Sequence, residues 1–288
     1  MVKKKGIDTV LIDADIILYS AGFAAQRAFY THVPTGDVYE TKGAYRAEHI
    51  AEENIQTTVE PEPINYAIHN ITSMINKCML GTETKKFRLF LSDKPTFRDK
   101  VATILPYKGN RDPTHKPFHY NEMRQYCIER LAAEIGDNLE ADDMLGINQT
   151  ETTCIASLDK DLDMIPGAHY HWKKKIMYTV SVPDANTWYY TQLLTGDPTD
   201  NIYGMRGIGQ KRAAVYLQKK PNKMTYYTHI LNRYILEVKK NDVLYEPEAL
   251  KTLEDVDDHA QYWFDENSVL LWILRSTSSN YLDLKNEK

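Results

Sequence analysis

The sequence contains few cysteines, no long apolar run and only a small excess of charge. The three cysteines are far apart and show no CxxC spacing, which argues against a disulfide framework and a structural zinc site. No segment has the apolar length needed to span a bilayer, and Asp8 and Asp13 interrupt the stretch that a signal peptide would need. We therefore expect a cytoplasmic protein without a membrane partner.

The balance of charge gives little guidance about binding partners. The formal net charge of −5 comes from 40 acidic residues against 35 lysines and arginines. Taken alone, this excess argues against a nucleic-acid-binding protein. However, whole-chain charge hides local patches, and acids that ligate cations would leave the rest of the surface nearly neutral. At 288 residues the chain can form one large domain or a large and a small one.

Three apolar, strand-like runs each end on an aspartate, namely Asp13, Asp93 and Asp159. If these runs lie side by side in a parallel sheet, the three aspartates meet at its carboxyl edge, where open α/β sheets bind ligands. Helical periodicity at 16–28, 64–80 and 123–135 surrounds the runs. The pattern predicts an α/β fold with a mostly parallel central sheet flanked by helices.

Further acids follow at helix starts and in loops, so that the candidate metal ligands are nine in number: Asp13, Asp93, Glu140, Asp142, Asp143, Asp159, Asp161, Asp197 and Asp200. Helix capping explains one or two acids at 140–143, but not three beside the strand-end aspartates. Such a cluster cannot stay ionised without cations. The sequence predicts an enzyme with Mg²⁺ or Mn²⁺, in which two ions roughly 3.5–4 Å apart activate water and stabilise a leaving oxygen.

Residues 94–120, called the basic segment below, are rich in lysine, arginine, proline, histidine and aromatic residues. Within this segment, Tyr107, Lys108 and Arg111 are the candidate catalytic residues. A cation above an acidic crevice suits phosphoryl transfer, because negative charge develops on the oxygens of the transferred phosphate. For the other lysines of the segment, a solvated loop is the simpler interpretation.

A glycine-rich turn opens a helix near residue 207, and its residues are the candidate DNA-binding set: Gly207, Ile208, Gly209, Gln210, Lys211 and Arg212. Glycines allow backbone N–H groups to approach a phosphate, and two cations stand in the first helical turn. The pattern becomes helical after residue 195, which predicts a domain boundary there. We expect Trp263, Phe264 and residues 269–274 to pack back on the first domain.

In this order, the motifs resemble the 5′-nuclease family, which includes flap endonucleases, polymerase I 5′-nuclease domains and phage 5′→3′ exonucleases. The resemblance covers residues 9 to about 218 and is nearest in style to the exonucleases of tailed phages. It implies a PIN-like nuclease domain at 1–195 with a helical arch at about 95–121. It also implies a helix-3-turn-helix module at about 196–218, followed by a C-terminal helical region to residue 288.

For function, the resemblance implies a monomeric enzyme that hydrolyses DNA at a 5′ end, nick or flap, or an RNA–DNA hybrid at an RNA primer, and leaves 5′-phosphates. Its setting would be phage DNA replication inside a bacterial host. K⁺ would bind at the helix-3-turn-helix, although Tyr203 and Arg206 replace the usual prolines there. A PIN-type ribonuclease and a non-catalytic DNA-binding protein stay open as alternatives. The sequence does not separate exonuclease from flap endonuclease activity, and it assigns no role to the hairpin at 29–41.

Overall fold

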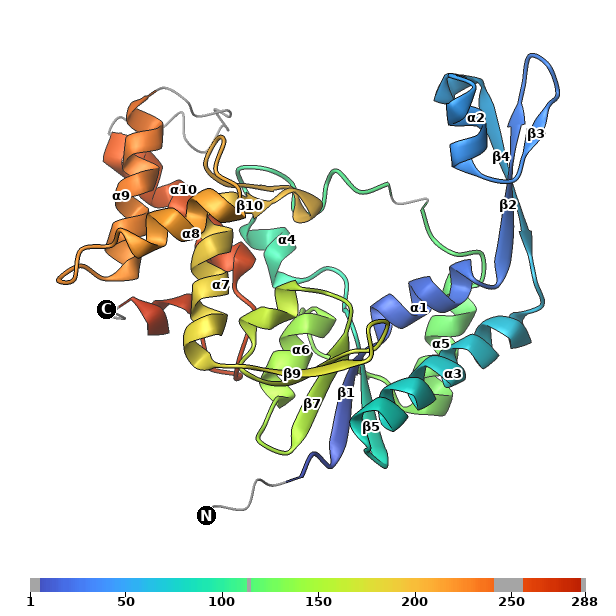
Figure 1. Ribbon diagram of the computed structural model, residues 1–288, viewed down its shortest axis with the longest axis horizontal. Helices are drawn as coiled ribbons and strands as arrows, with labels where there is room; N and C mark the ends of the chain where they lie inside the picture. Colours follow the sequence, from blue (N-terminus) through green and yellow to red (C-terminus); the bar gives the residue numbers. More distant parts are fainter. Residues whose placement is uncertain (1–5, 113–114, 241–255, 286–288) are drawn as a thin grey trace.

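A six-stranded sheet forms the centre of the computed structural model, which describes residues 6–112, 115–240 and 256–285 (Figure 1). Its strands lie in the order β6 (Glu134–Ile135), β5 (Lys86–Leu91), β1 (Thr9–Asp13), β7 (Thr153–Ser157), β8 (Gly167–His171) and β9 (Ile176–Val180). All neighbouring pairs are parallel except β8 with β9. The predicted α/β class with a mostly parallel sheet is confirmed.

Both faces of the sheet are covered, and alternate residues of β1 point into two separate cores. Val10 and Ile12 face a core that includes helices α1 (Ala14–Phe23), α3 (Ile64–Thr82) and α5 (Tyr120–Leu131). Leu11 faces the other core, with α6 (Ala141–Asn148) and α7 (Val182–Thr195). Because β1 is buried on both faces, its carboxyl end is held rigidly in the middle of the sheet.

The residues after 195 continue the second core. They form β10 (Gly196–Asp197), the short helix η3 (Pro198–Asp200), β11 (Ile202–Tyr203), α8 (Gln210–Gln218), α9 (Tyr226–Lys239) and α10 (Val256–Leu271), and η4 (Tyr281–Leu284) follows. Phe264 and Trp272 are buried in the same core as Leu11 and Phe90, which confirms the predicted packing of the C-terminal part. None of the helices in the described ranges could span a membrane.

Two predicted helices end too late. The helix predicted at 16–28 ends at Phe23, because Gln26 begins strand β2 (Gln26–His32). The helix predicted at 123–135 ends at Leu131, before β6. In both places, small apolar residues after the helix imitate helical periodicity, while distant strand pairing decides the conformation.

The predicted hairpin at 29–41 is part of a larger unit. Strands β2 and β3 (Val38–Tyr39) pair as expected, but β4 (Ile55–Pro61) joins them on the other side of β2. With α2 (Lys42–Ala47) and η1 (Glu52–Asn54), this three-stranded sheet projects from the body of the molecule (Figure 1).

The basic segment contains helix α4 (Phe97–Val101), and its part after α4 leads to α5 across the carboxyl edge of the sheet (Figure 1). Apart from α4, its described residues 102–112 and 115–119 contain no helix. At the described positions, the expected helical arch is therefore a loop, and its single helical turn, α4, lies at its start.

Candidate active site

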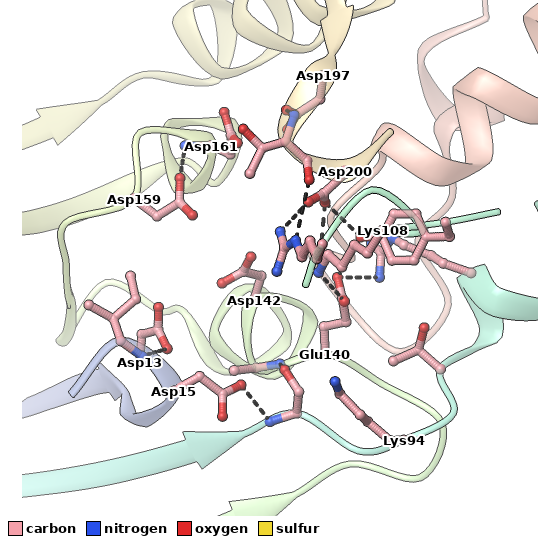
Figure 2. Close-up of a pocket in the computed structure, with 18 of the residues that line it drawn as sticks. Asp13, Asp15, Lys94, Lys108, Glu140, Asp142, Asp159, Asp161, Asp197 and Asp200 are labelled. Carbon is pink, nitrogen blue, oxygen red and sulfur yellow. Dashed lines mark hydrogen bonds and ion pairs between the residues drawn. The ribbon is translucent and has the colours of Figure 1, made fainter. Parts of the chain in front are cut away.

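A pocket of about 1190 Å³ opens at the carboxyl edge of the sheet, and it gathers most of the predicted acids. Eight of the nine predicted acidic residues line it, namely Asp13, Asp93, Glu140, Asp142, Asp159, Asp161, Asp197 and Asp200. Figure 2 labels all of these except Asp93. The lining also includes Tyr107, Lys108 and Arg111. Residues from six separate stretches of the chain thus meet around a single space.

The three strand-end aspartates reach the pocket in different ways. Asp13 ends β1, is 4% exposed, and accepts hydrogen bonds from Ile16 N at 3.2 Å and Ser157 Oγ at 3.3 Å. Asp93 accepts bonds from the backbone N–H groups of Lys94 and Asn138 at 2.8 and 3.0 Å. These two bonds lower the pKa of Asp93. Asp13 is therefore the inner acid, and Asp93 is one whose charge is already stabilised by the backbone.

The third strand continues into a turn that holds two more acids. Asp159 Oδ1 accepts a bond from Asp161 N at 2.9 Å, and Asp161 Oδ1 accepts one from Gln192 Nε2 at 2.7 Å. Asp197 caps η3 through Thr199 N at 2.8 Å. These local bonds fix the backbone of each turn and so hold the three carboxylates at the edge of the pocket.

The acids at the start of α6 separate into two environments. Glu140 and Asp142 line the pocket, whereas the side chain of Asp143 is fully buried outside it. Arg98 donates to both oxygens of Asp143 at 2.6 and 2.9 Å, and the N–H groups of Glu140 and Leu274 donate to it as well. The structure therefore does not place Asp143 with the other predicted metal ligands, because an arginine already neutralises it.

Four pocket carboxyls have raised pKa values, and for one of them, Asp200, burial raises the pKa despite the opposing charges of Lys108 and Arg111. Burial, followed by the charges of Asp15 and Asp159, raises the pKa of Asp13 to about 7. Burial together with Asp159 and Asp197 raises the pKa of Asp161 to about 7. Burial and the neighbouring acids Asp13 and Asp159 also raise the pKa of Asp142. The pocket therefore holds more negative charge than it can keep without a cation.

The basic segment closes one side of this pocket. The hydroxyl of Tyr107 lies 2.9 Å from Glu140 Oε2 and 2.8 Å from Asp200 Oδ2. Lys108 Nζ bonds Glu140 Oε1 and lies 3.7 Å from Asp200 Oδ2, and Arg111 Nη2 pairs with Asp200 Oδ1. Burial alone would raise the pKa of Glu140, but the charges of Lys108 and Arg98 outweigh it and lower the pKa. The side chains of Lys108 and Arg111 thus lie against the acids of the site.

Part of the chain is similar in sequence to two phage exonucleases. The chain is 31% identical to the exodeoxyribonuclease of enterobacteria phage T3 and 30% identical to the exonuclease of Escherichia phage T7, over 113 residues in each case. These alignments cover 36% of this chain and 37% and 38% of the two relatives, so the match spans little more than a third of each relative's length. No protein-family model matches the chain.

Two solved structures from phage T5 resemble the whole chain. One is the D15 protein co-crystallised with metal ions, with a TM-score of 0.52 and 17% identity, and the match covers 92% of this chain and 89% of that one. The other is the D15 flap endonuclease in a complex with DNA and metal ions, with a TM-score of 0.51, 15% identity and the same coverage. The chain has the 5′-nuclease fold. This fold and the phage relatives confirm the resemblance expected from the motifs.

In this 5′-nuclease fold, the predicted DNA-binding set lies outside the acidic pocket. Gly207 has a φ of +70°, and its carbonyl accepts a bond from Arg212 Nη1 at 2.7 Å. Helix α8 begins directly after Gly209, so the first N–H groups of α8 lie at an exposed turn. Buried Ala213 ties this helix to the core. The structure thus has two separate features, an acidic pocket and an exposed helix start.

Sequence reasoning missed several residues that shape the pocket. Gln192 holds Asp161, Arg124 Nη2 donates to Ser92 O at 2.8 Å, and Ser92 N donates to Asp15 Oδ2 at 3.0 Å. Asp15 is the exception, because the sequence already marks it, two residues after Asp13, as a candidate for an additional outer-shell acid. Arginines and glutamines on helices are usually solvated, so their inward direction was not readable.

The donor set suits a hard divalent cation, because carboxylate oxygens are the ligands that such ions prefer. Within the described ranges, no three acidic, histidine or cysteine side chains are already drawn together as a metal site. Like charges repel, and Glu140 and Asp200 are held by Tyr107, Lys108 and Arg111 instead. Burial first, and then repulsion between neighbouring carboxylates, raises the pKa values of Asp13 and Asp161, and a bound cation would offset both effects.

Proposed function

We propose that this chain is a Mg²⁺-dependent 5′-nuclease, a 5′→3′ exonuclease and flap endonuclease that hydrolyses phosphodiesters at the 5′ ends of DNA. The observation that carries this proposal is the pocket itself, where eight acids from separate strands and loops meet two cations of the basic segment. The phage T3 and T7 relatives are named as exonucleases, and the phage T5 structure with DNA is named as a flap endonuclease.

The cation ligands of this proposal are the pocket acids. Asp13, Asp142 and Asp159 would hold one ion in the centre, with Asp93 and Glu140 at its side, and Asp161, Asp197 and Asp200 would hold a second. Bound divalent cations, Mg²⁺ or Mn²⁺, would lower the pKa of the attacking water and offset charge on the leaving 3′ oxygen. Asp143 has no place in this set because Arg98 occupies its carboxylate.

In this proposal, three side chains of the basic segment have distinct roles. Lys108 and Arg111 leave Glu140 and Asp200 and pair with the scissile phosphate, where negative charge increases during the reaction. Tyr107 stays protonated, because burial and the charge of Glu140 raise its pKa well above the ordinary value. It therefore remains a hydrogen-bond donor that orients Glu140 and Asp200 at every physiological pH.

The helix start at Gly209 would hold the duplex. Exposed N–H groups with Lys211 and Arg212 suit a backbone phosphate, and the carbonyls of the turn before them suit a K⁺ ion. In this view residues 1–195 form the nuclease unit, and residues 196–288 grip the duplex and complete the core. We include RNA–DNA hybrids at primers among the substrates, phage DNA replication as the setting, and a monomer as the working form.

The decisive experiment follows cleavage of a 5′-labelled flap and a 5′-recessed duplex with Mg²⁺. Substitution of a direct cation ligand should cost more than the roughly 10–100-fold that is typical of outer-shell partners. We therefore expect Asp13→Asn and Asp159→Asn to lower the cleavage rate by more than about a hundredfold.

The matched control is Asp163→Asn. Asp163 is two residues from Asp161, but its carboxylate accepts a bond from Tyr178 and does not line the pocket. This variant should cleave at the wild-type rate. Full activity of Asp13→Asn would overturn the assignment, and a preference for single-stranded RNA over 5′-ended DNA would favour the PIN-type ribonuclease instead.

A further inference from the structure

The start of the basic segment is bound to the C-terminal helix α10. Glu266 of this helix is 7% exposed, and its two carboxylate oxygens accept hydrogen bonds from Thr103 N and Ile104 N, each at 3.0 Å. The hydroxyl of Thr103 also donates to Glu266, and it lies 2.6 Å from the hydroxyl of Tyr262. A charged acceptor on one helix thus holds two successive backbone N–H groups of the segment.

A second contact fixes the same region from the other side of α4. Arg98 is 2% exposed, and its donors reach Asp143, Leu270 O at 3.0 Å and Trp272 O at 2.5 Å. Asp143 in turn accepts from Leu274 N at 3.1 Å. Residues 270–274, called the C-terminal strap, therefore satisfy a buried ion pair between α4 and α6. A buried pair of this kind is stable only when all its partners are in place.

These contacts stand directly before the residues that close the pocket. Only two residues separate Ile104 from Tyr107, whose hydroxyl lies between Glu140 and Asp200. Three covalently linked residues cannot take up much displacement, so the position of Ile104 limits where Tyr107 and Lys108 can lie. Glu140, on the other side, is linked to Asp143 through its own N–H group.

We infer that Glu266 is a positioning residue for the reaction, since it fixes the basic segment so that Tyr107 and Lys108 face Glu140 and Asp200. This inference rests on the proposed nuclease function and gives the C-terminal helix a part in it. The reason is preorganisation: a displacement of about 1 Å near a reacting group can cost about a hundredfold in rate. The acidic ligands themselves do not depend on Glu266, because they are fixed by strand ends and local caps.

The test uses the full chain with Glu266→Gln, which keeps the size of the side chain but can accept through only one oxygen. Single-turnover cleavage of a 5′-flap DNA with Mg²⁺ should slow about ten- to a hundredfold, while affinity for the same DNA, measured with Ca²⁺, stays within about twofold. Hydrogen exchange of the Thr103 and Ile104 amides should become faster without DNA. The matched control is Asp265→Asn, whose neighbours are the hydroxyls of Tyr227 and Tyr281 rather than the basic segment.

The possible outcomes separate the two claims. Wild-type cleavage rates in Glu266→Gln, measured well below its melting temperature, would show a purely structural contact and overturn the inference alone. A wild-type chain that cleaves no nucleic acid would remove the proposed function and this inference with it. If Glu266→Gln does not fold, Thr103→Ala, at the exposed end of the same contact, is tested in its place. We expect a smaller loss of cleavage rate in this variant. Cleavage at the wild-type rate would contradict the inference.

Discussion

Asp13, Asp142 and Asp161 concentrate the electrostatic repulsion of the pocket in three side chains. Each has a raised pKa, caused first by burial and then by neighbouring carboxylates. Glu140 differs, because Lys108 and Arg98 lower its pKa. The pocket therefore combines acids that lack a cation with two acids, Glu140 and Asp200, that already lie against cations.

This difference predicts how the metal-free protein responds to pH. An acid with a raised pKa in the folded state binds its proton more tightly there than in the unfolded chain, so the folded state loses stability as pH rises from about 4. For Asp13 and Asp161 the loss develops from about pH 4 through the folded pKa of about 7 and levels off above it. We expect the melting temperature with a chelator to fall between pH 5 and pH 8, and saturating Mg²⁺ to remove the decline.

The control for this prediction is Asp13→Asn, which removes one titrating carboxyl. Its melting temperature with chelator should decline less steeply over the same pH range. The lowered pKa of buried His169 changes stability in the opposite direction, so the comparison of the two slopes isolates Asp13. Equal slopes in wild type and variant would contradict the raised pKa of this side chain.

At residue scale, the sequence correctly predicted which acids line the pocket where those acids end strands. The prediction failed where a distant cation decides the role of the acid. Asp13 reaches the pocket because β1 ends there, which strand periodicity reveals. Asp143 looked equivalent to its neighbours in the sequence, but Arg98, 45 positions away, binds it inside the core. Which of several adjacent acids meets a cation depends on tertiary packing that no local pattern encodes.

Among the elements, the turn between β10 and β11 makes close backbone contacts near the site. Gly196 has a φ of +67°, and a Cβ added there would lie 2.2 Å from Gly204 N and 2.4 Å from Ile202 O. Asp197 follows Gly196 directly, and η3 then carries Asp200. The geometry of two pocket acids thus depends on a glycine.

We therefore expect Gly196→Ala to lower the free energy of unfolding by roughly 1–3 kcal/mol, because both the backbone conformation and the space exclude a side chain. Thermal or urea unfolding measures the change. Gly43→Ala in α2 is the matched control, since its added Cβ would meet only Thr41 Oγ1 at 3.9 Å, and it should be neutral or slightly stabilising. A Gly196→Ala protein as stable as wild type would mean that β10 and β11 separate at little cost.

At element scale, the prediction was best for segments with strong periodicity of their own. Helix α3 begins at the predicted residue 64 and ends two residues after the predicted residue 80, and strand β7 ends two residues before Asp159, the acid predicted to end it. Strand β4 was not recognised, because six of its seven residues are exposed and its conformation follows from pairing with β2. An exposed strand lacks the hydrophobic alternation that reveals strands in a sequence.

For the whole molecule, one core joins the parts on either side of residue 195. Tyr189 donates to Ser268 O at 3.1 Å, and Tyr234 donates to Leu193 O at 2.7 Å. The C-terminal strap also supplies two carbonyl acceptors to Arg98. The predicted boundary near 195 stays a prediction about sequence organisation, and these contacts argue that the two parts depend on each other for stability.

We expect residues 1–195 expressed alone to lack a cooperative unfolding transition. Buried side chains of α7 such as Tyr189, Leu193 and Leu194 would lose partners, and each fully buried large side chain contributes about 1.5–3 kcal/mol. Because a domain of this kind is stable by only about 5–15 kcal/mol, exposing several of them removes most of its stability. The buried Arg98–Asp143 pair would lose partners as well, which adds a further cost. Thermal melting of the fragment, followed by circular dichroism, measures this loss of cooperativity. Adding residues 196–288 as a separate chain should restore the transition. A fragment that melts cooperatively within a few degrees of the full chain would instead establish 1–195 as an independent domain.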